Sequence, residues 1–183
     1  MTLPAMTPTD ADCCAVRQMA SGLLSGVADV VAEFDQAQFC TPSEQLKGGT
    51  FGKHLRHVTD HYAAILAGLD GDEPLEYDQR RRDVPEESDP KVAASIARDL
   101  ASNIDGLSPD ALHSETTIRV MLNGEGDEAV LSTTAARELF FASHHAIHHF
   151  AMMRAIASEL GIELGDDFGK APSTVNHEKA CDE

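Results

Sequence analysis

Apolar residues recur along much of the chain at intervals of three and four positions. This spacing runs from about Ala11 to Asp35, from Thr50 to Leu69, from Pro90 to Ile104 and from Thr134 to Leu160. Residues three and four apart share one face of a helix, so each segment reads as a helix that buries an apolar stripe. The pattern therefore predicts four main helices that pack their stripes together.

A segment with another pattern lies between the third and fourth predicted helices. Residues Glu115 to Val120 and Ala129 to Ser132 flank the sequence Asn123-Gly124-Glu125-Gly126. Two short runs of strand-forming residues around a glycine-containing turn are typical of a β-hairpin. We therefore expect a mainly all-α protein, a four-helix bundle with a small β-hairpin inserted before the last helix.

Turn-forming residues separate these elements and set the domain limits. We read residues 1–10 as a flexible leader, 11–175 as a single bundle domain and 176–183 as a C-terminal tail. Residues 36–49 and 168–174 read as irregular segments. Ser88-Asp89-Pro90 is a predicted helix start, since a capping side chain precedes a proline. The last helix would be capped by Ser132, Thr133 or Thr134 and would end at Gly161.

The composition narrows the set of partners. The net charge of −17 argues against nucleic acid, because a phosphate backbone requires a basic surface. No apolar run is long enough to span a bilayer, and the N-terminus lacks the features of a secretory signal. We therefore expect a cytoplasmic protein that binds neither nucleic acid nor membrane. The four cysteines form no CxxC pair, and we expect them to act as small, buried apolar side chains.

Seven of the nine histidines lie on the second and fourth predicted helices. In the fourth helix, His145 and His149 are four apart and share the apolar stripe, whereas His144 and His148 turn towards Arg137. The inward pair is therefore His145 and His149. On the second helix, the border of the apolar stripe carries three more histidines: His54, His57 and His61.

An inward pair plus one histidine from another helix offers three nitrogen ligands and leaves a position for water or substrate. Imidazole suits zinc, nickel, copper and iron, and a bound ion would lower the pKa of water or of a thiol. Glu138 and Asp60 are the candidate carboxylates that could orient a ligand or take part in catalysis. The alternative is that the histidines are hydrogen-bonded core residues with no metal.

Two motifs carry a resemblance to a known family. These are His57-Val58-Thr59-Asp60-His61 and the histidine run of the last helix, and with them the chain from about Gly22 to Ser173 resembles the DinB-like (YfiT-like) proteins. The resemblance implies an up-and-down four-helix bundle with a divalent metal on His57, His145 and His149. Zinc or nickel would be the metal, with iron and manganese as further candidates.

The resemblance also bears on activity and substrate. Family members include metal-dependent transferases that act through low-molecular-weight thiols, and an isomerase. Many members have Arg-Gly-Gln after the last ligand, where this chain has Phe150-Ala151-Met152. A branch of the family shares the Tyr77–Arg82 loop and the Phe168–Thr174 segment. We expect both segments at the mouth of the site, with Tyr77, Arg80 and Arg82 contacting an anionic substrate such as a carboxylated thiol. The alternative for the Phe168–Thr174 segment is a cover over an apolar bundle end. The alternative for Arg80 to Arg82 is a solvated loop that pairs with nearby acidic residues.

The leading hypothesis is a metal-dependent enzyme, a thiol S-transferase or a hydrolase, that acts on a small molecule and forms a homodimer. The second hypothesis is a metal- or ligand-binding bundle without catalysis. The third is a dimerising bundle with a vestigial site.

Overall fold

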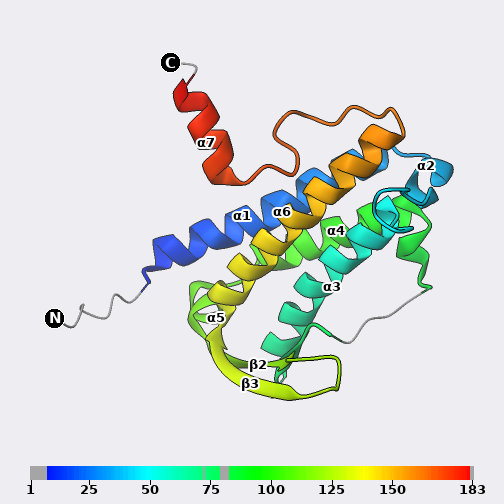
Figure 1. The fold of residues 1–183 in the computed structure, drawn as a ribbon. Coiled ribbons are helices and arrows are strands. Elements are labelled where there is room, and N and C mark those ends of the chain that lie inside the picture. The colour runs from blue at the N-terminus through cyan, green and yellow to red at the C-terminus, as the bar shows by residue number, and fades with distance from the viewer. Residues whose placement is uncertain (1–7, 72, 79–82, 182–183) are drawn as a thin grey trace.

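The computed structural model describes residues 8–71, 73–78 and 83–181. Its framework is four helices, α1 (Asp10–Ala32), α3 (Phe51–Leu69), α4 (Pro90–Asp105) and α6 (Ala135–Glu159). Helix α1 packs on α4 and α6, and α3 packs on the same two helices, so that the four enclose one core (Figure 1). The predicted four-helix bundle is confirmed.

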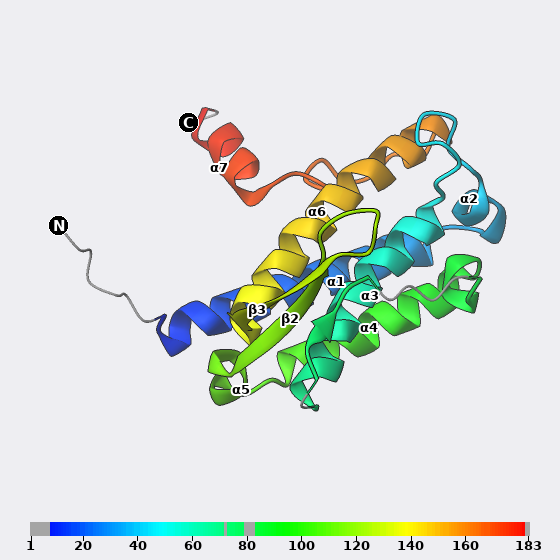
Figure 2. The same ribbon diagram turned by 60° about the horizontal axis from the view of Figure 1, so that its bottom comes forward.

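The order of the helices differs from a simple up-and-down alternation. Arg56, near the start of α3, pairs with Glu87, which lies just before α4, so α3 and α4 begin at the same end of the bundle. Figures 1 and 2 show both helices running away from that end. The connection between them therefore returns along the length of the bundle before α4 begins.

Capping side chains explain where the main helices begin. Each side chain accepts a hydrogen bond from a backbone N–H of the first helical turn, which would otherwise lack a partner. The caps are Thr9 for α1, Thr50 for α3, Asp89 for α4 and Thr134 for α6. Helix α6 is followed by Gly161 at a φ of 70°, a conformation that favours glycine. The predicted starts at Asp89-Pro90 and Thr134 and the predicted end at Gly161 are confirmed.

The hairpin before α6 is also confirmed, with longer strands than predicted. Strand β2 (Glu115–Met121) pairs antiparallel with β3 (Glu128–Thr134). A third strand, β1 (Leu75–Glu76), pairs parallel with β2 through Leu75 and Ile118. Two residues are too few to show an alternating pattern, so β1 could not be predicted. Its pairing fixes the position of the chain just before Tyr77.

Four short helices complete the described chain: α2 (Gln36–Cys40), η1 (Pro85–Glu87), α5 (Pro109–His113) and α7 (Pro172–Cys181). The first three span at most five residues, which is too short for an apolar repeat. Helix α7 has no buried residue, so its sequence carries no stripe. The irregular segments predicted at 36–49 and 168–174 therefore contain α2 and the start of α7. Helix α7 also spans the predicted domain limit at residue 175.

The core is formed by apolar side chains from all four main helices, among them Leu24, Leu55, Tyr62, Ile104 and Met153. Of the four cysteines, Cys13 is buried, Cys14 and Cys40 are half-buried and Cys181 is exposed. The expectation of buried thiols thus holds for Cys13 alone. Within the described residues, every helix is too short or too polar to cross a membrane.

Candidate metal centre

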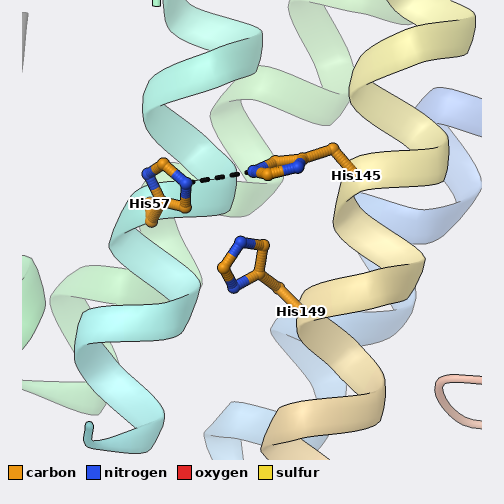
Figure 3. Close-up of side chains that lie close together, drawn as sticks. All are labelled: His57, His145 and His149. Carbon is orange, nitrogen blue, oxygen red and sulfur yellow. Dashed lines mark hydrogen bonds between the residues drawn. The ribbon is translucent and has the colours of Figure 1, made fainter. Parts of the chain in front are cut away.

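Helices α3 and α6 lie side by side and bring three imidazoles into one space (Figure 3). His57 comes from α3, and His145 and His149 stand one turn apart on α6. The Nε2 atoms of His57 and His145 are 3.0 Å apart. One nitrogen from each of the three rings lies within 4.8 Å of the other two. The structure therefore brings together the three histidines that the resemblance picked out.

The apolar stripe of α6 determines which face of this helix is buried. His149 is buried, as are Ala142, Met153 and Ile156 of the same stripe, whereas His144 and His148 are exposed. His145 is half-buried, as is His57 of α3. The predicted inward pair is thus confirmed as a matter of packing, and its role in metal binding stays a prediction.

Burial keeps His149 in the form that a metal requires. Removal from water, together with repulsion from the charged forms of His145, His57, His54 and His148, lowers its pKa to about 2. The ring is therefore neutral at neutral pH. A neutral imidazole is the form that binds a metal ion.

The spacing of the three rings fits a divalent metal. A tetrahedral ion with nitrogen ligands at about 2.0–2.1 Å holds its ligand atoms about 3.3 Å apart. The separation of 3.0 Å between His57 and His145 is close to this value, and a nitrogen of His149 lies within 4.8 Å of both. Three nitrogen donors leave a position for a further ligand, as in catalytic sites.

His54, one turn before His57 on α3, contacts the other nitrogen of His149. The two Nδ1 atoms are 2.9 Å apart. Because Nδ1 of His149 faces His54, its Nε2 is the atom that points towards His57 and His145, as Figure 3 shows. The family resemblance does not include His54 among the ligands, and the structure gives it a specific contact with one of them.

Aromatic rings cover the other side of the histidine group. His61 stacks on His145 with ring centroids 4.2 Å apart, and Tyr77 stacks on His61 at 4.7 Å. Phe141 lies parallel to His145 at 6.0 Å and contacts Tyr77 at 5.7 Å. Tyr77 is half-buried and Phe141 is 37% exposed, so these two rings separate the histidines from solvent. Phe141 could not be predicted as part of the site, because it falls beside the apolar stripe of α6.

The candidate carboxylate Glu138 accepts a hydrogen bond from Tyr77 and is not one of the close donors of the histidine group. It is fully buried, and the Tyr77 hydroxyl donates to its Oε2 at 2.7 Å. Thr133 and Arg137 donate to its Oε1 at 2.6 and 2.8 Å. With both oxygens occupied, Glu138 positions Tyr77 against His61.

The second candidate, Asp60, also has another partner. Arg56 pairs with Asp60 at 2.7 Å and with Glu87 at 2.9 Å, and all three side chains are largely buried. This ion-pair chain ties α3 to the segment before α4. Neither Asp60 nor Glu138 belongs to the group of three close donors.

Arg80 and Arg82, two of the three residues of the predicted substrate site, lie outside the described residues, together with Arg81. Tyr77 is described, and its ring forms part of the cover over His61 and His145. The roles of Tyr77, Arg80 and Arg82 in substrate binding therefore stay predictions.

The C-terminal segment lies elsewhere than predicted. Phe168 stacks on Phe150 with centroids 5.1 Å apart, and Arg154 donates to its carbonyl at 2.7 Å. In both ribbon views, α7 lies on the side of α6 that faces away from α3 (Figures 1 and 2). The segment covers the outer side of α6, because Phe150 points about 100° away from His149. The prediction that it borders the metal site is wrong.

A second hydrogen-bonded group, formed by Cys13, His113 and Asp10, was not predicted from the sequence. His113 contacts the Cys13 sulfur through Nδ1 at 3.7 Å and Asp10 through Nε2 at 2.9 Å. The residue types match a nucleophile, a base and an orienting acid. However, Cys13 is only 2% exposed, and burial raises the pKa of its thiol, helped by Asp12, Asp10 and Cys14. The group therefore ties α5 to α1.

Comparisons with known proteins bear on the fold. No family model matches the chain. FK506-binding protein 5 from Rhizopus delemar is 34% identical over 106 residues, which make up 57% of this chain and 28% of that protein. Because most of that relative lies outside the match, the binding activity in its name is not carried over to this chain.

The structure of YfiT from Bacillus subtilis resembles this one with a TM-score of 0.60, covering 88% of this chain and 95% of that chain. YfiT is described as a probable metal-dependent hydrolase with an unusual four-helix bundle topology. The sequence identity is 14%, so the likeness concerns the fold. The chain has the DinB-like (YfiT-like) four-helix-bundle fold, with three histidines gathered between its second and last main helices.

Proposed function

We propose that this protein is a divalent-metal-dependent enzyme whose metal is held by His57, His145 and His149. The observation that carries the proposal is the meeting of three imidazole nitrogens within 4.8 Å of one another, two of them 3.0 Å apart. A divalent ion bound there would lower the pKa of bound water to about 7, or that of a bound thiol, and so supply a nucleophile at neutral pH. The fold shared with YfiT supports the same proposal.

The chain's own residues would bind and orient the reactants. His57, His145 and His149 are neutral donors, so a metal ion would keep its full double charge. Phe141 stacks on the half-buried His145 and contacts Tyr77, and these two rings would contact a small substrate. Arg80 and Arg82, three and five residues after Tyr77, would pair with an anionic group of that substrate.

The reaction type is either hydrolysis or transfer to a thiol. Both reactions need a nucleophile that binds at the open position of the metal and is activated there. The rings of Tyr77 and Phe141 lie beside that position. Zinc and nickel are the proposed metals, because imidazole-only sites suit them, and iron and manganese come after them. The proposal includes a cytoplasmic protein that takes a small-molecule substrate, with neither nucleic acid nor membrane as a partner.

Two alternatives make different demands on the site. In a non-catalytic binding protein, the metal would have no open coordination position that an added small molecule could occupy. A vestigial site would bind no metal and would keep contacts such as that between His57 and His145 as hydrogen bonds. Replacing the native metal by cobalt separates these cases. The enzyme proposal expects the visible spectrum of the cobalt protein to change when a small thiol is added, through a sulfur-to-cobalt charge-transfer band.

We also propose that two copies associate through the hairpin. Strand β3 is at the edge of the sheet, and large apolar side chains are exposed on and beside it: Met121, Leu122, Val130 and Leu131, each at least 50% exposed. Such an edge pairs readily with another strand. Light scattering should give the mass of a dimer for the wild type and of a monomer for Leu131→Lys. A monomeric wild type would contradict the proposal.

The test of the enzyme proposal begins with protein purified without a histidine tag or nickel column. Elemental analysis should find about one divalent metal per chain. The metal-loaded protein is then assayed against esters and amides, and against electrophiles with a small thiol as acceptor. A metal-free protein that takes up no added zinc or nickel would overturn the proposal.

A further inference from the structure

We propose that His54 is a positioning residue that fixes the tautomer of His149, so that the Nε2 atom of His149 is free of a proton and faces the other two ligands. The inference rests on the proposed function, since it assigns a role to His54 towards the proposed metal. Carboxylates or backbone carbonyls usually perform this role in metalloproteins. Here a second imidazole occupies that position.

The proton arrangement follows from the contact between the two rings. Two Nδ1 atoms 2.9 Å apart form a hydrogen bond only if one of them carries a hydrogen and the other has a lone pair. If His149 carries the hydrogen on Nδ1, its Nε2 has the lone pair that a metal needs. His54 must then accept at Nδ1 and carry its own hydrogen on Nε2. This hydrogen bond couples the tautomers of the two rings, and the arrangement with the hydrogen on Nδ1 of His149 is the one that suits metal binding.

The packing around His54 holds its ring in this position. A Cβ added at Gly49 would lie 2.8 Å from Nε2 of His54, so the ring occupies space that only glycine leaves open. The loop that carries Gly49 is itself fixed. Glu159, at the end of α6, accepts hydrogen bonds from the Ser43 hydroxyl at 2.8 Å and from the Glu44 N–H at 3.1 Å. The two helices that carry His54 and His149 are therefore joined by a third segment.

Both rings are neutral in this arrangement. Burial lowers the pKa of His54, and the charge of His148 lowers it further. A neutral acceptor such as His54 attracts the Nδ1 hydrogen of His149 less strongly than a carboxylate would. His149 is then a weaker electron donor, and a metal bound to it would remain a stronger Lewis acid.

The first experiment needs no metal. Histidine-labelled, metal-free protein is studied by NMR through the long-range couplings between ring nitrogens and carbon-bound hydrogens, which report the tautomer of each ring. We expect His149 with its hydrogen on Nδ1 and His54 with its hydrogen on Nε2. A His149 ring with its hydrogen on Nε2 would overturn the proposal.

The second experiment compares three side chains at position 54. In His54→Asn, an amide oxygen can take the place of Nδ1 as acceptor, whereas His54→Leu fills similar space with no acceptor. We expect zinc affinity to fall about 10–100-fold in His54→Leu and to be largely restored in His54→Asn. His144→Ala, which removes an exposed histidine, is the control and should match the wild type.

The outcomes separate this inference from the proposed function. If His54→Leu binds zinc as tightly as the wild type, His54 has no role in zinc binding. If His54→Asn binds zinc as weakly as His54→Leu, His54 acts through packing and not through its hydrogen bond. Either result would overturn the inference. If the wild type binds no metal, the proposed function fails, while the NMR measurement still decides which nitrogen of His149 carries the hydrogen.

Discussion

The hydroxyl of Tyr77 donates a hydrogen bond to Glu138 at 2.7 Å, and this contact links the connection after α3 to the first turns of α6. Glu138 is fully buried, and a buried carboxylate is stable only with several donors. The contact also holds the Tyr77 ring parallel to His61, with an angle of 13° between the ring planes. Tyr77, which lies in the connection between α3 and α4, is thus held by contacts to both α3 and α6.

The two tyrosines offer a matched test of this contact. Tyr77→Phe removes a hydrogen bond to a buried carboxylate and should lower the free energy of unfolding by about 1.5–3 kcal/mol. Tyr62→Phe removes a bond between two hydroxyls, to Ser143 at 3.2 Å, and should cost about 0.5–1.5 kcal/mol. Urea unfolding followed by circular dichroism measures both. Equal losses would mean that the Glu138 contact has no special weight.

Tyrosine ionisation gives a pH test. Burial raises the pKa of both tyrosines above 10.0, and for Tyr77 the hydrogen bond and the charge of Glu138 raise it further. Above pH 10 the folded protein therefore retains phenol protons that the unfolded chain releases, so its stability falls as the pH rises. The chain has two tyrosines and no tryptophan, so the tyrosinate absorbance is easily resolved. It should rise only together with loss of the helical signal. A tyrosine that ionises near pH 10 in folded protein would contradict the burial of that ring.

The C-terminal segment should depend on one glycine. Gly169 has a φ of 77°, and a Cβ there would lie 2.7 Å from the Ala151 backbone nitrogen. Gly169→Ala should release the segment from α6 and expose it to limited proteolysis, because the left-handed conformation alone costs about 1–2 kcal/mol. Gly165→Ala is the control, since a Cβ there meets no atom within 4 Å. Equal cleavage rates in the two variants would mean that the segment is not docked through Gly169.

Thiol reactivity should separate the cysteines. Cys13 is buried, and the raised pKa of its thiol keeps it protonated, whereas Cys181 is exposed. Alkylation of the folded protein should label Cys181 within the time in which Cys13 stays unmodified, as mass spectrometry of the peptides would show. Rapid labelling of Cys13 would instead support a reactive group with His113 and Asp10.

The four main helices could be predicted because each has several turns that bury one face. The same reasoning oriented α6, since the stripe through Ala142, His149 and Ile156 decides which histidines point inward. The choice of His57 among the histidines of α3 came from the family resemblance. Periodicity alone left His54, His57 and His61 equivalent at the border of the stripe.

The features that escaped prediction depend on contacts between distant segments. Strand β1 exists because Leu75 pairs with Ile118, and the partners of Glu138 come from residues 77, 133 and 137. The return of the chain before α4, seen in the pairing of Arg56 with Glu87, likewise leaves no local signal. The sequence therefore identified the candidate ligands, and the structure was needed to find the residues that surround them.

The most direct test of the central claim measures the metal content of four proteins purified without a tag: the wild type, His145→Ala, His149→Ala and His144→Ala. His145 and His149 belong to the close group, whereas His144 is exposed on the same helix. We predict about one divalent metal per chain in the wild type and in His144→Ala, and a loss of stoichiometric metal in the other two. Metal retained in His145→Ala and lost in His144→Ala would contradict the account.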